Sequence, residues 1–140
     1  MALVPKIRIR DAAQFLNVSD DTVRRWIDAG ALPVETDASN RKVVDGRALA
    51  LFARDHAQPV TDPSSVERSA RNRFVGLVTE ITADTVMAQV ELQCGPFRVV
   101  SLMSSEAVRE LGLEPGSVAV AVVKATTVIV ETPSGRRETP

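Results

Sequence analysis

The sequence of 140 residues contains one cysteine, Cys94, and one histidine, His56. A single cysteine cannot form a disulfide within the chain, and this usage is typical of proteins that work in a reducing compartment. Zinc sites generally take four ligands, mostly cysteine and histidine, so these two residues exclude a conventional zinc site built by one chain.

Long apolar runs are also missing. No run approaches the roughly 20 apolar residues that a transmembrane helix needs. The first ten residues, MALVPKIRIR, are too short and too charged for a signal peptide. We therefore expect a cytoplasmic protein that does not associate with a membrane.

Signals of catalysis are absent as well. His56 is not paired with a nucleophile, and the sequence has no glycine-rich loop of the P-loop or dinucleotide-binding type. Clustered carboxylates alternate with arginines, which predicts surface ion pairs. The sequence thus favours a protein that is not an enzyme and has no organic cofactor. The formal net charge of -1 gives no general argument for nucleic acid, so DNA binding has to depend on local placement of basic residues.

The residues that are present fall into two halves of different periodicity. A polar segment with two prolines, residues 58–67, predicts a linker. Residues 1–57 before it show helical periodicity, whereas the apolar residues of 68–132 alternate or form β-branched runs. A polar tail over 133–140 is expected to be disordered. The sequence therefore predicts two small domains joined by a linker.

The first half predicts a helix-turn-helix. Asp11 is expected to cap a helix over 11–16. Either Ser19 or Asp20 is expected to cap a second helix, which ends at Gly30. Two short helices joined by a turn of three or four residues form this motif.

The second helix has an apolar face and a polar face. Val23, Trp26 and Ile27 are spaced i, i+3 and i+4, so they should pack inward. The opposite face carries hydroxyl and guanidinium groups, and an arginine there can bind a guanine edge or a phosphate.

A wing and a third helix are expected beyond this helix. Residues 30–34 and 41–44 predict two strands around a polar loop, and 45–54 predicts a helix. The string IRIRDAAQFLNVSDDTVRRWIDAGALP, followed by NRKVV and the last helix, resembles the winged helix-turn-helix of the MerR/excisionase group over residues 6–55. The resemblance implies a partner in double-stranded DNA. The candidate DNA contacts are Ser19, Thr22, Arg24, Arg25, Arg41 and Lys42.

The alternative is that the arginines of the second helix form a solvated surface. Arg24 and Arg25 stand at helical spacing from Asp20, Asp21 and Asp28, so surface ion pairs would satisfy them. These carboxylates would also repel phosphates, and DNA binding is then expected to depend on dimerisation. The turn and the wing favour DNA binding over this alternative.

The second half predicts a small β-barrel with one short helix, because several strands and a single helix are typical of such folds. The fold class is therefore α+β, a winged helix-turn-helix followed by a small OB-like β-barrel. The expected strands are 73–78, 86–92, 118–123 and 128–130, and the expected helix is 105–111, which ends at Gly112.

Three short pieces of the second half follow a family pattern. They are Ser69-Ala70-Arg71-Asn72, then Ser104 seven positions before Leu111-Gly112-Leu113, and finally Lys124-Ala125-Thr126. Their order and spacing resemble the Mop/TOBE molybdate-binding family, which includes the molbindins and the ligand domain of ModE-type regulators. The family commonly has threonine where this chain has Ser104, a change that keeps the hydroxyl. A polar amide is replaced by Arg73, an extra cation that would either strengthen anion binding or lie in solvent.

The resemblance implies a site for molybdate or tungstate. Both are tetrahedral dianions with only acceptor oxygens, so a pocket must supply positive charge and many N–H or O–H donors. Arginine and lysine carry the charge at neutral pH, and hydroxyls and backbone amides supply further donors. The sequence does not separate these ligands from vanadate or sulfate. The implied ligand residues are Ser69, Ala70, Arg71, Ser104, Lys124, Ala125 and Thr126.

Members of this family build such sites between subunits, so the resemblance implies at least a homodimer, with a hexamer as an alternative. We interpret the chain as an oxyanion-responsive transcription regulator, with activator and repressor equally open. One alternative is a storage protein for molybdate or tungstate whose helical half has lost DNA affinity. Another is an architectural DNA-binding protein with a ligand-free barrel.

Overall fold

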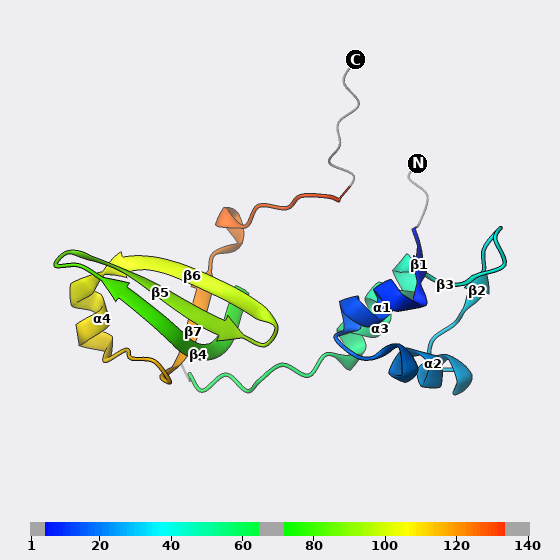
Figure 1. Ribbon diagram of the computed structural model, residues 1–140, viewed down its shortest axis with the longest axis horizontal. Helices are drawn as coiled ribbons and strands as arrows, with labels where there is room; N and C mark the ends of the chain where they lie inside the picture. Colours follow the sequence, from blue (N-terminus) through cyan, green and yellow to red (C-terminus); the bar gives the residue numbers. More distant parts are fainter. Residues whose placement is uncertain (1–4, 65–71, 134–140) are drawn as a thin grey trace, which may run out of the picture. The chain divides into compact units, whose positions relative to one another are not determined.

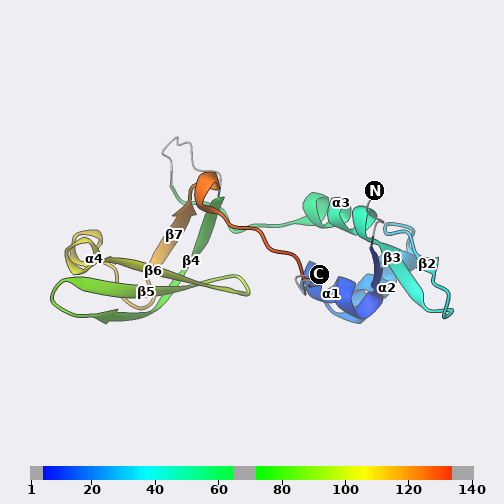
Figure 2. The same ribbon diagram turned by 90° about the horizontal axis from the view of Figure 1, so that it is seen from above.

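The computed structural model describes residues 5–64 and 72–133, and the chain forms two compact units, Met1–Pro59 and Val60–Pro140 (Figures 1 and 2). The first unit is a winged helix-turn-helix and the second is a curled antiparallel sheet with one α-helix, which confirms the predicted α+β class. No helix within the described ranges is long and apolar enough to cross a membrane.

The central strand of the first unit is β3 (Lys42–Asp45). It pairs antiparallel with β1 (Lys6–Arg8) on one side and with β2 (Glu35–Thr36) on the other. Strands β2 and β3 form the predicted wing. The helices of this unit are α1 (Ile9–Leu16), α2 (Asp20–Asp28) and α3 (Gly46–His56).

The first strand of the wing was predicted at 30–34, and this was wrong. Leu32 is 1% exposed and packs in the core, so the backbone around it does not run along the sheet. Pro33 has no N–H to donate to a ladder. The pairing therefore starts only at Glu35, opposite Val43.

One of the two helix caps that the sequence predicted is confirmed. The Ser19 hydroxyl accepts a hydrogen bond from the backbone N–H of Thr22 at the start of α2. The Asp45 carboxylate accepts one from the N–H of Ala48 at the start of α3. The predicted cap Asp11 lies in the first turn of α1 instead, because β1 continues directly into the helix.

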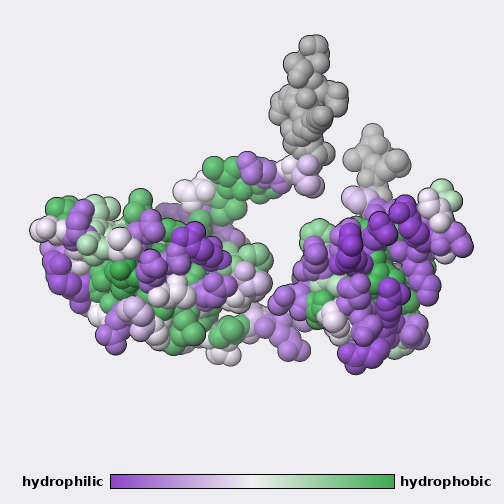
Figure 3. Space-filling view, in the orientation of Figure 1, coloured by the Kyte–Doolittle hydropathy of each residue, from purple (hydrophilic) through white to green (hydrophobic). Residues whose placement is uncertain are grey.

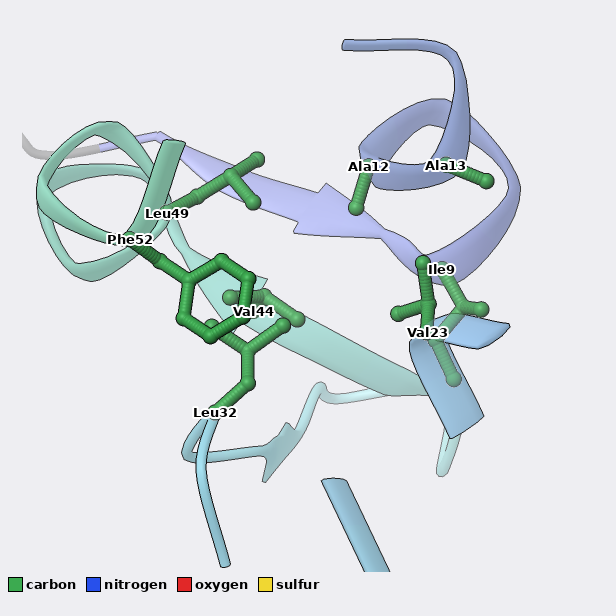
Figure 4. Packing of buried hydrophobic residues seen from close by; sticks show 8 residues of the cluster. All are labelled: Ile9, Ala12, Ala13, Val23, Leu32, Val44, Leu49 and Phe52. Atoms are coloured by element: carbon green, nitrogen blue, oxygen red, sulfur yellow. The ribbon is translucent and has the colours of Figure 1, made fainter. Parts of the chain in front are cut away.

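The core of the first unit lies where all three helices meet the central strand (Figure 4). Figure 4 shows Val44 of β3 beside Leu32 and Phe52, with the α1 and α2 side chains farther along the strand. The ring centroids of Trp26 and Phe52 are 5.0 Å apart, and the His56 ring stacks on Phe52 at 3.8 Å. The buried residues are Ile9, Ala12, Ala13, Val23, Leu32, Val44, Leu49 and Phe52.

The second unit has the strand order β6-β5-β4-β7, all antiparallel. The sheet curls into a half-barrel, and α4 packs at one end of it (Figures 1 and 2). The described elements are β4 (Asn72–Ala83), β5 (Met87–Cys94), β6 (Phe97–Ser104), α4 (Ser105–Leu111), β7 (Val118–Val123) and the 3-10 helix η1 (Ala125–Thr127).

The core of this unit is small. Its buried cluster consists of Val78, Ala88, Val90, Leu92, Cys94 and Val108. Strands β4 and β5 approach so closely at Gly76 that a Cβ atom there would lie 2.5 Å from the carbonyl oxygen of Gln93. Burial raises the pKa of the Cys94 thiol, which agrees with a packing role for this residue.

The strand predicted at 128–130 was wrong. Chain direction changes at η1, directly after β7, and the segment that follows joins no strand among the described residues. Ile129 is 86% exposed and Val130 is 84% exposed. An apolar run of this length predicts burial but does not tell whether the covering surface belongs to the same chain.

Candidate functional site

A chain of hydrogen bonds joins three of the predicted DNA contacts on the outer face of α2. The hydroxyls of Ser19 and Thr22 lie 3.0 Å apart, and the Arg25 guanidinium donates to the Thr22 hydroxyl at 3.0 Å. Val23, Trp26 and Ile27 pack against the core as their spacing predicts. The helix therefore presents a prearranged guanidinium to solvent.

The other three predicted DNA contacts gather at a separate cavity of about 280 Å³. Arg24 comes from α2, Lys42 from β3, and Arg41 from the turn of the wing. Arg8 and Arg10, which the sequence analysis did not select, line the same cavity. Five cations therefore line one hollow.

Arg8 and Arg10 could have been found from the alternation of basic and apolar residues in Lys6-Ile7-Arg8-Ile9-Arg10. That pattern suits a short strand that buries the isoleucines. The isoleucine Ile9 is 6% exposed, and both arginines are exposed. A five-residue pattern that runs from a strand into a helix is too short to predict either element.

The ion-pair alternative for the α2 arginines is not what the structure contains. Among residues 5–64 and 72–133, neither Arg24 nor Arg25 forms an ion pair with Asp20, Asp21 or Asp28. The Asp20 side chain does line the cavity and lowers its positive potential. The arginine side chains remain available to an anionic partner.

The turn of the wing is held by Asp37. Its carboxylate accepts hydrogen bonds from the backbone N–H groups of Arg41 and Ser39, each at 2.9 Å, and pairs with the Arg41 side chain at 3.3 Å. The Arg41 backbone bond is the main cause that lowers the pKa of Asp37. The fixed turn sets the direction in which the wing presents its cations.

Lys6 has a structural role in the same unit. Its ammonium donates to Glu35 at 3.0 Å and to Asp45 at 3.3 Å, which ties the three strands together. The hydrogen bond to Glu35 is the main cause that raises the pKa of Lys6. The Ala48 backbone bond is the main cause that lowers the pKa of Asp45.

In the second unit, Asn72, the one described residue of the first anion-motif piece, lies at the end of the sheet from which the third piece starts. Asn72 pairs with Val123 in the β4–β7 ladder, and the Asn72 amide donates to the Val123 carbonyl at 3.1 Å. Lys124 follows Val123 directly. The predicted ligands Ser69, Ala70 and Arg71 lie outside the described residues, immediately before Asn72 in the sequence.

Lys124, Ala125 and Thr126 are exposed where the chain turns into η1. The Lys124 carbonyl accepts bonds from the N–H and the hydroxyl of Thr127, at 2.9 and 2.8 Å. Within the described part of the chain, the Lys124 ammonium forms no ion pair. This turn offers a free cation and exposed donors.

Ser104 lies at the other end of the sheet. It pairs with Met87 at the start of β5, beside the end of β4, and its hydroxyl caps α4 through the Ala107 N–H at 3.0 Å. Strand β4 has 12 residues and so extends roughly 35 Å along its path. Figures 1 and 2 show α4 and η1 well apart on this unit, so one chain does not bring Ser104 and Lys124 together.

The concave side of the sheet is open and apolar. A cavity of about 560 Å³ lies between β7 and the strands β5 and β6. Leu111 lines this cavity and is 66% exposed, and Figure 3 shows apolar surface on the visible face of the unit.

Comparison with known proteins gives a separate match for each unit. Residues 7–56 match the family model of a helix-turn-helix domain, and residues 68–130 match that of a TOBE domain. A probable molybdenum-pterin-binding protein of Haemophilus influenzae is 44% identical over 63 residues, which make up 44% of this chain and 91% of that protein.

The molybdenum transport protein ModE of Herbaspirillum seropedicae is 35% identical over 69 residues, 49% of this chain. The chain spans only 26% of that relative's length. Among solved structures, a molybdate-binding protein from Sporomusa ovata is similar at 33% identity and a TM-score of 0.47, over 48% of this chain and 100% of that chain.

Proposed function

The chain belongs, through its TOBE domain, to the family of the molybdenum-pterin-binding proteins, and on this premise we propose that it is a molybdate-responsive transcription regulator. Its second unit binds molybdate or tungstate, and its helix-turn-helix unit binds double-stranded DNA. It acts in the cytoplasm as a homo-oligomer and catalyses no reaction.

The observation that carries the proposal is the register of β4 and β7. The Asn72–Val123 pair places the two positions that adjoin the early and the late motif at the same end of one ladder. A dianion there would be bound by the cations Arg71 and Lys124, with hydroxyl and backbone donors around it. The proposed ligands are Ser69, Ala70, Arg71, Ser104, Lys124, Ala125 and Thr126.

We propose that the complete site forms between copies of the chain. Because Ser104 and Lys124 lie at opposite ends of one sheet, a single chain supplies only part of the set. The exposed apolar residues and the open cavity of this unit provide a surface that a second copy would cover. At least a dimer is required, and a hexamer would satisfy the same condition.

The first unit supports DNA binding through two groups of side chains. Arg25, held by Thr22, would reach a base edge or a phosphate, and the cavity cations would bind backbone phosphates. An oligomer carries two or more such units, which would meet two half-sites of one operator. Anion binding that fixes the oligomer would therefore change DNA affinity.

Titration calorimetry of the purified chain with molybdate, tungstate and sulfate tests the anion site. We expect micromolar or tighter binding of molybdate or tungstate and no heat with sulfate. A gel-shift assay on genomic fragments, with and without molybdate, tests the regulator. Anion binding without any shifted fragment at low salt would leave a storage protein, and a shifted fragment without anion binding would leave an architectural DNA-binding protein.

A further inference from the structure

The first described residues of the second unit, 60–64, are attached to its sheet through Asp62 and Ser64. Arg73, the second residue of β4, donates from Nε to the Asp62 carboxylate at 2.6 Å and from Nη2 to the Ser64 hydroxyl at 3.2 Å. The Asp62 carboxylate also accepts the N–H of Ser64 at 2.8 Å. Arg73 therefore does not lie free in solvent, which was one of the two alternatives that the sequence left open; the other, a contribution to anion binding, stays a prediction.

This ion pair is the least exposed one among residues 5–64 and 72–133. The Arg73 side chain is 18% exposed and that of Asp62 is 32% exposed, whereas the Arg54–Asp55 pair on α3 is 73% and 60% exposed. Charges that are partly shielded from water interact more strongly than fully hydrated ones. Each charge of the Arg73–Asp62 ion pair should therefore interact strongly with an anion that binds nearby.

The contact lies at the end of the sheet where the oxyanion is proposed to bind. Arg73 pairs with Val122, and its neighbour Asn72 pairs with Val123, so Lys124 is the next residue on the facing strand. A dianion beside Lys124 would attract the Arg73 guanidinium. It would also repel the Asp62 carboxylate, which holds that guanidinium.

We propose that Arg73 and Asp62 set the affinity of the oxyanion site, with the linker carboxylate and the dianion competing for one guanidinium. The inference rests on the proposed function, since it requires an anion at this end of the sheet. Linkage makes the competition reciprocal, so anion binding weakens the attachment of residues 60–64. Because α3 ends at His56, release of this segment lengthens the tether of the helix-turn-helix unit.

The test is titration calorimetry with molybdate on the full chain at low ionic strength. Arg73 and Ser64 donate to different oxygens of the Asp62 carboxylate, so the Asp62→Asn variant removes the charge and keeps one of the two accepting oxygens. It is expected to bind molybdate about threefold to tenfold more tightly, the effect of one carboxylate near a dianion. In an Arg73→Gln background the same change is expected to have less than a twofold effect, because the competition is lost.

Glu91→Gln is the matched control, since it also removes one carboxylate of an ion pair, with Arg98, in the same sheet. It is expected to leave molybdate affinity unchanged. Thermal melting checks that each variant folds. If Asp62→Asn fails this check, Ser64→Ala, which removes one hydrogen bond to Arg73, is expected to give a smaller increase in affinity.

Hydrogen exchange of the amides of residues 60–64 supplies a second readout. Molybdate is expected to speed this exchange in the wild type, and Asp62→Asn is expected to show fast exchange without ligand. Wild type that binds no molybdate would overturn the proposed function and this inference together. Wild type that binds molybdate, with Asp62→Asn unchanged or weaker, or with an equal gain in Glu91→Gln, would overturn this inference alone.

Discussion

In the first unit the candidate DNA contacts form two groups on adjoining elements, whereas in the second unit the described candidate oxyanion ligands lie at two ends of one sheet. The first unit buries eight residues in one cluster and, among described residues, exposes only Phe15, Val34 and Leu51 of its large apolar side chains. In the described part of the second unit, fourteen such side chains are exposed. The second unit is thus the one whose core and site we propose are completed by further copies of the chain.

The largest expected effect is a loss of molybdate affinity when a positive charge is removed from the second unit but not from the first. Replacing Lys124 with alanine is expected to lower molybdate affinity tenfold to a hundredfold, because a charge-assisted contact to a dianion is lost. Calorimetry measures this change. Lys42→Ala is the matched control, since it removes the same charge from the first unit and should leave molybdate affinity intact. Equal losses in both variants would mean that the effect is one of net charge and not of a site.

Mixing two variants tests whether the oxyanion site spans two copies. Ser104→Ala and Lys124→Ala should each weaken molybdate binding, and the two proteins are then unfolded together and refolded as a mixture. If each site takes Ser104 from one copy and Lys124 from another, about a quarter of the sites in a random mixture of dimers regain both residues. Calorimetric stoichiometry reports that fraction. A mixture with no tight sites would contradict a shared site.

A change on α2 should affect only DNA binding. Arg25→Ala is expected to weaken DNA binding by roughly tenfold, the value of about one good polar contact, and to leave molybdate affinity unchanged.

Arg8→Ala, on β1, should instead lower the salt dependence of DNA binding. If Arg8 contacts one phosphate, the slope of log K against log salt should fall in magnitude by about 0.9. Gel shifts at several salt concentrations distinguish the two effects. An unchanged slope for Arg8→Ala would remove it from the interface.

Sequence reasoning succeeded where a signal is local. Ser19 at the start of α2, the inward face of Val23, and the short helix α4 that ends at Gly112 in the left-handed conformation all follow from spacing of a few residues. It failed where a residue depends on distant partners. Arg8 joins the basic cavity only because β1 and β3 pair over more than 30 residues.

The site of the second unit shows the same limit. The resemblance in motif order gave a set of candidate ligand residues, but no spacing along the chain indicates that Ser104 and Lys124 lie at opposite ends of β4. The pairing of Asp62 with Arg73 was also hidden, because the prolines at 59 and 63 favoured a free linker. The apolar run at 128–130 gave a further false strand, since its covering surface is not in the described part of the chain.

The smallest expected effect is a loss of folding stability at low pH, which can be compared between the two units. The folded pKa values of Asp37 and Asp45 lie below the ordinary value of 3.8, since both carboxylates accept backbone hydrogen bonds. Their contribution to stability is therefore present above that value and is lost as the pH falls through the lowered folded values. In the second unit, Asp84 is lowered by its bonds to the N–H groups of Met87 and Val86, in that order. Thermal melting between pH 7 and about pH 3 should show a loss of stability that is smaller in Asp45→Asn, which keeps the cap but cannot titrate. Because each unit has its own core, this substitution should leave the acid response of the second unit unchanged.

An Asp45→Asn variant whose melting temperature falls with pH as steeply as that of the wild type would show that other carboxylates determine the acid response of the first unit.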